Sequence, residues 1–146
     1  MIALIQRVAQ AHVLIDQKVH ASIGPGLLAL VCAQASDSEE SCLKLLDKLI
    51  HYRVFSDSNG KMNLSLRDTL GDLLIVSQFT LSADTRKGRR PSFSSGASPE
   101  LAKHWIDYLI QQACKVEIGQ VQSGVFGADM QVSLTNDGPV TFWLEV

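Results

Sequence analysis

Two hydroxyl side chains and an amide lie close together in the stretch SQFTL (77–81), directly after an apolar run. Ser77 or Thr80 could act as a nucleophile, or the stretch could offer hydrogen-bond donors at the end of an active-site strand. Strand alternation places Ser77, Phe79 and Leu81 on one face and Gln78 and Thr80 on the other. A strand end that only meets solvent gives the same pattern, so the pattern alone leaves both interpretations open.

No side-chain base accompanies these hydroxyl groups in the sequence. The four histidines are scattered at His12, His20, His51 and His104, and their spacing does not support a Ser-His-acid arrangement. The sequence also contains no Walker loop, no GxGxxG after a strand and no HExxH motif. We therefore expect neither a metal nor another cofactor.

Positive charge is concentrated in one segment, TRKGRRPSF (85–93), within a polar loop that we expect to span residues 82–97. Four of the thirteen basic residues lie there, namely Arg86, Lys87, Arg89 and Arg90. Such a cluster suits nucleic-acid phosphates, which arginine can bind in bidentate fashion. Because the net charge of the chain is −2, any such contact must come from this local patch. The alternative is a solvated charged loop.

Two glycines mark the run SGVFGADM (123–130), where Gly124 and Gly127 flank Phe126, and Met130 follows. Glycine at such spacing permits a bulge or a close approach of the backbone. The simpler interpretation is a β-hairpin in which Phe126 and Met130 belong to the core.

The chain ends on two strand-like runs, MQVSLT and VTFWLEV, joined by Asn136-Asp137-Gly138-Pro139. Asn-Asp-Gly is typical of a tight turn, but Pro139 cannot donate a backbone N–H where the next strand should begin. The segment is therefore either a sharp corner or backbone that is shaped for another purpose.

Composition indicates an ordinary globular protein. Of the 146 residues, 46% are hydrophobic and 19% charged, which fits one domain over residues 1–146. The N-terminal run lacks the features of a signal peptide and no run is long enough to span a membrane, so we expect a cytoplasmic protein. We expect the three cysteines, Cys32, Cys42 and Cys114, to be buried free thiols.

Hydrophobic periodicity predicts the elements that must position these residues. We expect strands at 2–15, 19–24, 26–34 and 72–81, and three more strands from Val116 onward. Two helices should pack on them. One begins at Ser36, Asp37 or Ser38, and its apolar stripe consists of Cys42, Leu45, Leu46, Leu49 and Ile50.

The second helix should begin with Ser98 as its N-cap and Pro99 in its first turn. Its stripe consists of Leu101, Trp105, Ile106, Leu109 and Ile110. The prediction is an α/β fold with a barrel-like, mixed or antiparallel sheet and two packed helices. Because two helices cannot cover both faces of such a sheet, a closed barrel or a dimer interface should cover the rest.

Two motifs, SQFTL and NDGPVT, together resemble those of the bacterial D-aminoacyl-tRNA deacylases, formerly called D-tyrosyl-tRNA deacylases. The resemblance extends over the whole chain and includes MIALIQRV, DTRKGRRPSF and GVFGADM. It implies hydrolysis of the ester between a D-amino acid and the terminal ribose of tRNA. It also implies removal of glycine from mischarged alanine tRNA.

The resemblance further implies a homodimer in which each subunit inserts a cis Gly138-Pro139 bond into the partner's active site. Backbone pressed against the substrate Cα would exclude an L side chain, whereas a D side chain would point to solvent and glycine would pass. The Gly-Pro segment would then be a chirality gate.

Roles for individual residues follow from the same resemblance. It implies catalytic positions at Ser77, Gln78, Phe79 and Thr80, contacts to the terminal adenosine from Phe126 and Met130, a substrate-binding position at Asn136, and phosphate contacts from Arg86, Lys87, Arg89 and Arg90. Two chemical routes remain open. Either Thr80 attacks the ester, or backbone N–H groups around Phe79 orient it while the 2′-OH of the RNA assists a water molecule.

Two other classes of protein compete with a deacylase. The basic loop (86–90) and Phe126 would also suit a non-catalytic RNA-binding module. A purely structural dimeric protein is the second alternative.

Overall fold

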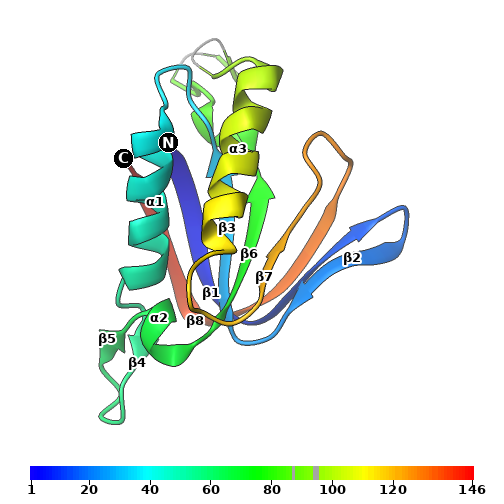
Figure 1. Ribbon diagram of the computed structural model, residues 1–146. Coiled ribbons are helices and arrows are strands. Elements are labelled where there is room, and N and C mark those ends of the chain that lie inside the picture. Colours follow the sequence, from blue (N-terminus) through cyan, green and yellow to red (C-terminus); the bar gives the residue numbers. More distant parts are fainter. Residues whose placement is uncertain (87, 94–95) are drawn as a thin grey trace.

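The computed structural model describes residues 1–86, 88–93 and 96–146. Its centre is a six-stranded sheet in the order β2-β1-β3-β6-β7, with β8 paired to the free side of β1 (Figure 1). The strands are β1 (Ile2–Ile15), β2 (Lys18–Ile23), β3 (Gly26–Cys32), β6 (Asp72–Ser77), β7 (Val121–Ser123) and β8 (Gln131–Glu145). Strands β1, β2, β3 and β8 pair antiparallel, whereas β3-β6 and β6-β7 pair parallel, so the sheet is mixed.

Two long helices cover one face of the sheet, as the periodicity predicts. They are α1 (Glu39–His51) and α3 (Pro99–Ala113). Of the three possible N-caps for α1, Ser38 is the one used, because its side chain accepts from the Ser41 N–H. Ser98 caps α3 as predicted. Shorter elements are β4 (Phe55–Ser56), β5 (Met62–Leu64), α2 (Leu66–Thr69) and the 3₁₀ turn η1 (Phe79–Ser82).

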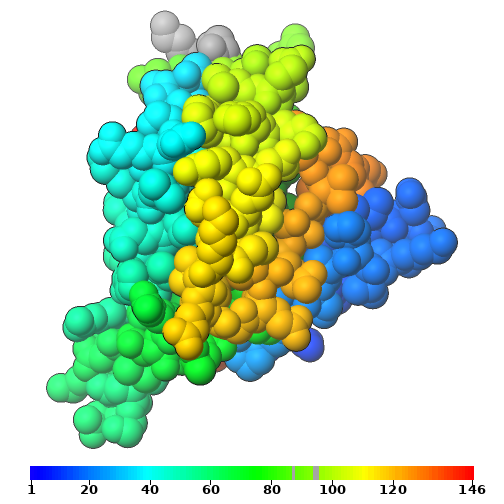
Figure 2. Space-filling view, in the orientation of Figure 1, coloured from blue at the N-terminus to red at the C-terminus, as the bar shows by residue number. Residues whose placement is uncertain are grey.

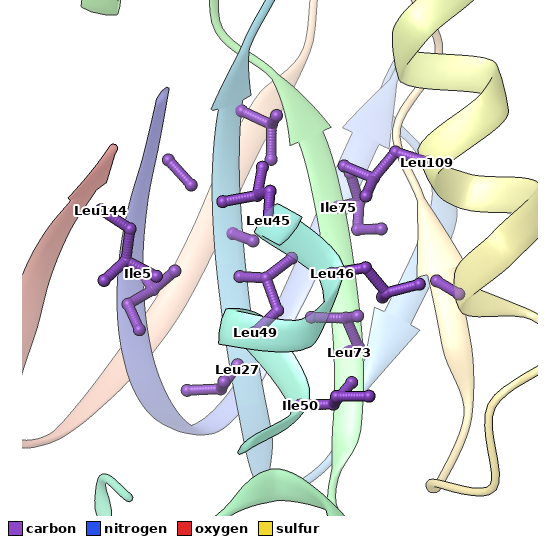
Figure 3. Close-up of a cluster of buried hydrophobic side chains, with 14 of the residues drawn as sticks. Ile5, Leu27, Leu45, Leu46, Leu49, Ile50, Leu73, Ile75, Leu109 and Leu144 are labelled. Atoms are coloured by element: carbon purple, nitrogen blue, oxygen red, sulfur yellow. The ribbon is translucent and has the colours of Figure 1, made fainter. Parts of the chain in front are cut away.

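The main core lies between the helices and the sheet (Figure 3). Leu45, Leu46, Leu49 and Ile50 of α1 point onto the strands, and Leu109 joins them from α3. A second core fills the concave side of the sheet, where Val8, Val13, Ile23, Leu28 and Leu74 are buried. Strands β1 and β2 bend around this second core, which gives the sheet its predicted, nearly closed barrel-like form.

Three expectations about the elements are wrong. The strand that begins at Asp72 ends at Ser77, because the chain turns into η1. The alternation expected for residues 78–81 therefore does not apply. The segment after Val116 forms two strands rather than three, because β8 continues without interruption through the expected turn. Cys32 and Cys42 are buried free thiols as expected, but Cys114 is exposed.

The parallel pair β3-β6 determines where polar groups gather. Both strands run in the same direction, and Val31 pairs with Ser77, so Cys32 and Ser77 end at the same edge of the sheet. The N-terminus of α3 lies at that edge too (Figure 1). In open α/β sheets this is the edge at which ligands bind. No helix in the described part of the chain is long and apolar enough to cross a membrane.

Candidate active site

The turn after β6 exposes the backbone of the SQFTL stretch. The Gln78 N–H donates to the Val31 carbonyl at 2.7 Å, which anchors the first residue after the strand to β3. Residues Phe79 to Ser82 then form one 3₁₀ turn, in which the Leu81 N–H donates to the Gln78 carbonyl. The first N–H groups of a helical turn have no acceptor within the turn. The N–H groups of Phe79 and Thr80 are therefore available to a ligand.

Side chains of the stretch fix this turn rather than form a catalytic dyad. Gln78 Nε2 donates to Thr80 Oγ1 at 2.5 Å, and Ser82 Oγ donates to the Phe79 carbonyl at 2.8 Å. Thr80 is exposed, and no histidine or carboxylate accepts its proton among residues 1–86, 88–93 and 96–146. The turn is thus a rigid backbone element that carries an exposed hydroxyl group.

A cavity of about 550 Å³ opens beside the turn, and we call it the site cavity. It brings together five residues that the sequence singled out: Ser77, Gln78, Phe79, Phe126 and Met130. Its remaining walls are mostly apolar and include Ala97, Pro99, Ala102 and Val132. A volume and lining of this kind suit a nucleoside-sized ligand. Thr80 does not line the cavity, although it follows Phe79 directly.

Gly124 allows Met130 to reach the site cavity. A Cβ atom at Gly124 would lie 2.6 Å from Met130 Sδ, which is too close for any other residue type without displacement of the methionine. The glycine therefore serves close packing of two segments, one of the two uses that its spacing suggests. Phe126 and Met130 also pack partly against the two cores, as the simpler interpretation expects. The expected β-hairpin is wrong, because β7 pairs with β6 and β8 pairs with β1.

Two residues that the sequence analysis did not assign to the site adjoin the turn. The Phe93 ring lies 5.0 Å from the Phe79 ring, with both rings partly exposed. Cys32 Sγ donates to the Phe79 carbonyl at 3.5 Å, and burial raises the pKa of this thiol, so it remains neutral under the turn. Only the pairing of β3 with β6 brings Cys32 here, and no local sequence signal predicts that pairing.

Arg86 of the basic loop forms an ion pair with Asp84. Arg86 donates through Nε and Nη2 to the two carboxylate oxygens of Asp84, at 2.9 and 2.8 Å, and this contact lowers the pKa of Asp84. Arg89 and Arg90 are exposed. Lys87 lies outside the described residues. The guanidinium of Arg86 is therefore already occupied by a carboxylate, which distinguishes it from Arg89 and Arg90.

The Asn136–Pro139 segment is a bulge within β8, not a turn between two strands. Asn136 pairs with Val8 and Thr141 with Gln6, so β8 has four residues between these pairs where β1 has one. The Gly138-Pro139 bond is cis, as the resemblance implies, and both residues are exposed. A bulge needs no ladder donor at each position, which explains why a proline is tolerated here.

Side chains hold the bulge at both ends. Asn136 Oδ1 accepts from the Val140 N–H at 2.8 Å, and Asn136 Nδ2 donates to Thr141 Oγ1 at 3.0 Å. Arg7 donates from Nε to the Asp137 carbonyl at 2.8 Å and from Nη1 to the Val54 carbonyl at 2.7 Å. Within one chain, Asn136 thus positions the Gly-Pro segment and does not line the site cavity.

The Gly-Pro segment and the SQFTL turn lie at opposite ends of the sheet. Val8 pairs with both Asn136 and Gly26, and Gly26 pairs with Asp72 at the start of β6. Ser77 lies at the other end of β6, about 16 Å further along at about 3.3 Å per residue. A single chain therefore does not bring Gly138 and Pro139 to its own site cavity.

The described part of the chain contains no group of three or more His, Cys, Asp or Glu side chains that could hold a metal ion. What the site offers is main-chain N–H groups, one exposed hydroxyl and a largely apolar cavity. This set can bind and orient an ester and stabilise an oxyanion.

A mixed α/β domain with such a site can bind and orient an ester, and sequence comparison identifies the family. The sequence profile described as D-Tyr-tRNA(Tyr) deacylase matches residues 4–145. A D-aminoacyl-tRNA deacylase from Haemophilus influenzae (strain 86-028NP) is 57% identical over 146 residues, with 100% of both chains covered. The enzyme of the same name from Janthinobacterium sp. (strain Marseille) is 54% identical, with 100% of this chain and 97% of that one covered. The protein is an enzyme of the D-Tyr-tRNA(Tyr) deacylase family.

Two solved structures share the fold of this chain. The c-Myc DNA Unwinding Element Binding Protein superposes with a TM-score of 0.95 at 34% identity, covering 100% of this chain and 99% of the other. A structure described as a probable eukaryotic D-amino acid tRNA deacylase has a TM-score of 0.83 at 18% identity, covering 99% and 98%. The second likeness concerns the fold alone.

Proposed function

We propose that this protein hydrolyses the ester of D-aminoacyl-tRNA to a free D-amino acid and tRNA, and that it rejects L-aminoacyl-tRNA. Its membership of the deacylase family supports the reaction type. The observation that carries the proposal is the 3₁₀ turn at the site cavity: Phe79 lines the cavity, and the N–H groups of Phe79 and Thr80 have no acceptor within the turn. These are the donors that an ester carbonyl needs as it becomes an oxyanion.

The terminal adenosine occupies the site cavity in this proposal. Phe126 and Met130 contact the adenine, and Gln78 holds the turn through its hydrogen bond to Thr80. The ester carbonyl then lies at the N–H groups of Phe79 and Thr80. Loss of one oxyanion donor costs about 2.7–4 kcal/mol in other hydrolases, so two fixed donors can supply much of the rate.

The attacking group is a water molecule assisted by the 2′-OH of the RNA. The hydrogen bonding of Thr80 supports this route over a threonine nucleophile, because Thr80 accepts from Gln78 and has no base beside it among the described residues. An unactivated hydroxyl is a weak nucleophile.

The working unit in this proposal is a homodimer, and each Gly138-Pro139 segment enters the partner's site cavity. The separation of the segment from the site within one chain supports a contribution from a second copy. Gly138 and Pro139 are exposed, and Gly138 has no Cβ, so their backbone can approach a substrate Cα closely. This backbone excludes an L side chain, whereas D-amino acids and the glycine of mischarged alanine tRNA are accepted.

The enzyme acts in the cytoplasm as one domain over residues 1–146. The exposed Arg89 and Arg90 bind acceptor-stem phosphates.

A direct test is incubation with D-tyrosyl-tRNA and L-tyrosyl-tRNA at equal concentration, with release of each amino acid measured. The proposal expects release of D-tyrosine alone. Retardation of both tRNAs in a gel without cleavage would identify an RNA-binding module instead. Neither binding nor cleavage would indicate a structural protein.

A further inference from the structure

A second cavity adjoins the site cavity between α3 and β7. We call it the α3–β7 cavity; its volume is about 410 Å³, and the lining residues that matter here are His20, Ser77, Lys103, Asp107, Gln111 and Phe126. Ser77 and Phe126 line both cavities, so the two cavities adjoin at these residues. In Figure 2 the space lies between yellow α3 and the orange segment that follows β7.

Helix α3 forms a common wall for the two cavities. Ala102 lines the site cavity, and Ile106, four residues later, lines the α3–β7 cavity. At 1.5 Å per residue these positions are separated by about 6 Å along the helix axis. One nucleotide unit can bridge such a distance. A nucleotide joined to an adenosine in the site cavity can therefore reach the α3–β7 cavity.

The polar side of the α3–β7 cavity presents one acceptor beside one donor. Lys103 Nζ donates to Asp107 Oδ2 at 2.5 Å, and the two side chains remain 58% and 44% exposed. Cytosine has the complementary edge, because its N4 amino group is a donor and its N3 and O2 atoms are acceptors. Uracil places the O4 acceptor where cytosine has the N4 donor. Two acceptors, uracil O4 and the Asp107 carboxylate, would then face each other without a hydrogen bond.

The apolar side of the α3–β7 cavity suits the face of a base. Ile106 and Ile110 of α3 contribute aliphatic surface, and Phe126 and His20 contribute rings. Bases of single-stranded RNA stack on such rings while side chains read the Watson–Crick edge. Gln111 adds an amide within the same cavity, which can both donate and accept.

We infer that the α3–β7 cavity binds the cytidine that precedes the terminal adenosine of tRNA. Asp107 accepts from the cytosine N4 amino group, and Lys103 donates to the N3 and O2 edge. The inference rests on the proposed function, because it takes the site cavity as the place of the terminal adenosine. Since every mature tRNA ends in CCA, such a site adds affinity without restricting the enzyme to one tRNA.

Binding of dinucleoside monophosphates tests the inference without any hydrolysis. Chemical-shift titrations with cytidylyl-adenosine (CpA) and uridylyl-adenosine (UpA) give a Kd for each ligand. The wild-type protein is expected to bind CpA at least about fivefold more tightly than UpA, since one well-paired base edge discriminates by this factor or more. In K103A/D107A, which changes two partly exposed helix positions, the preference should disappear.

The matched control is E40A/K44A, which removes the same kind of (i, i+4) ion pair from α1. This variant should retain the preference for CpA. Equal Kd values for CpA and UpA with the wild-type protein overturn the inference, even where D-tyrosyl-tRNA is hydrolysed. A preference that survives in K103A/D107A overturns it too. A preference that requires Lys103 and Asp107, in a protein that releases no D-tyrosine, supports the cytidine site and refutes the proposed reaction instead.

Discussion

The side-chain amide of Gln78 donates a hydrogen bond to the hydroxyl oxygen of Thr80 across 2.5 Å. This contact joins two polar side chains of the SQFTL stretch and holds the start of the 3₁₀ turn Phe79–Ser82. It also directs an N–H at the Thr80 oxygen, which makes that oxygen less electron-rich rather than more. The geometry thus favours a structural use of the hydroxyl group.

The first prediction concerns the Thr80 hydroxyl. Thr80→Val keeps the branched shape and removes the hydroxyl, so we expect kcat for D-tyrosyl-tRNA to stay within about tenfold of the wild-type value, which corresponds to about 1.4 kcal/mol. Thr85→Val, at an exposed position of the neighbouring loop, is the control. If kcat fell by three orders of magnitude in the Thr80 variant alone, Thr80 would be the nucleophile. Burst kinetics would then reveal the acyl-enzyme.

The second prediction concerns Gly138. A Cβ atom there would lie 2.6 Å from both the Val140 N atom and Val140 Cγ2. Gly138→Ala must therefore displace the bulge, and we expect at least about tenfold lower kcat/KM for D-tyrosyl-tRNA and for glycyl-tRNA alike. Gly24→Ala is the matched control, because its Cβ would meet only Asp72 Oδ2 at an ordinary 3.5 Å. Full activity of the Gly138 variant on both substrates would disprove the gate.

The third prediction concerns the support of the bulge by Arg7. Its side chain is only 12% exposed, and it donates to the carbonyls of Val54 and Asp137. Arg7→Met leaves both acceptors without this donor, so we expect the free energy of unfolding to fall by about 1–3 kcal/mol. Urea titrations at one protein concentration measure the loss. Asp137→Asn keeps the backbone acceptor and removes only the ion pair between Arg7 Nε and Asp137 Oδ2 at 3.2 Å, so it should cost less than half as much. An equal cost would mean that this exposed ion pair dominates.

The fourth prediction separates the arginines of the basic loop. Arg86 is paired with Asp84, whereas Arg89 and Arg90 are exposed. Each phosphate contact that is lost should reduce the slope of log K against log salt by about 0.7–0.9. We expect this reduction for Arg89→Gln and Arg90→Gln, and a smaller one for Arg86→Gln, in tRNA-binding titrations over a range of salt concentrations. If the slope of log K against log salt kept its wild-type value in all three variants, the loop would be excluded as the phosphate contact.

Local signals in the sequence predicted the elements that depend on local interactions. The stripe of α1 and the Ser98 cap of α3 follow from spacing alone, and both helices lie where they were expected. The end of β6 could not be predicted in this way. It is set by the bond from the Gln78 N–H to the Val31 carbonyl, which joins residues far apart in the sequence.

The same distinction applies to the site. The SQFTL stretch, Phe126 and Met130 are recognisable by residue type and motif, and the site cavity brings them together. Cys32 and Phe93 reach the turn only through the β3–β6 pairing and the path of a long loop. The expected turn at Asn136 is in fact a bulge, because the side chain of Asn136 satisfies the Val140 N–H that a turn would have left free.

The last prediction concerns Cys42, which is buried and donates to the Trp105 carbonyl. Burial raises the pKa of this thiol from its ordinary value near 9 to about 11. The thiol remains neutral in the folded chain while it ionises in the unfolded one, so its contribution to stability is complete below pH 9 and is lost as the pH rises toward 11. The loss is of the order of 2 kcal/mol, at about 1.4 kcal/mol per pKa unit.

Urea unfolding of the wild type and of Cys42→Ala between pH 8 and pH 11 measures this contribution. The variant is less stable at pH 8 because of the cavity, but its stability should fall less steeply with pH than that of the wild type. Cys114→Ala is the control, since it removes a thiol from an exposed position. In the folded protein at pH 8, a thiol reagent should modify Cys114 and spare Cys42, because Cys114 is exposed whereas Cys42 is buried. Parallel pH profiles for the wild type and Cys42→Ala would show that burial does not hold this thiol neutral.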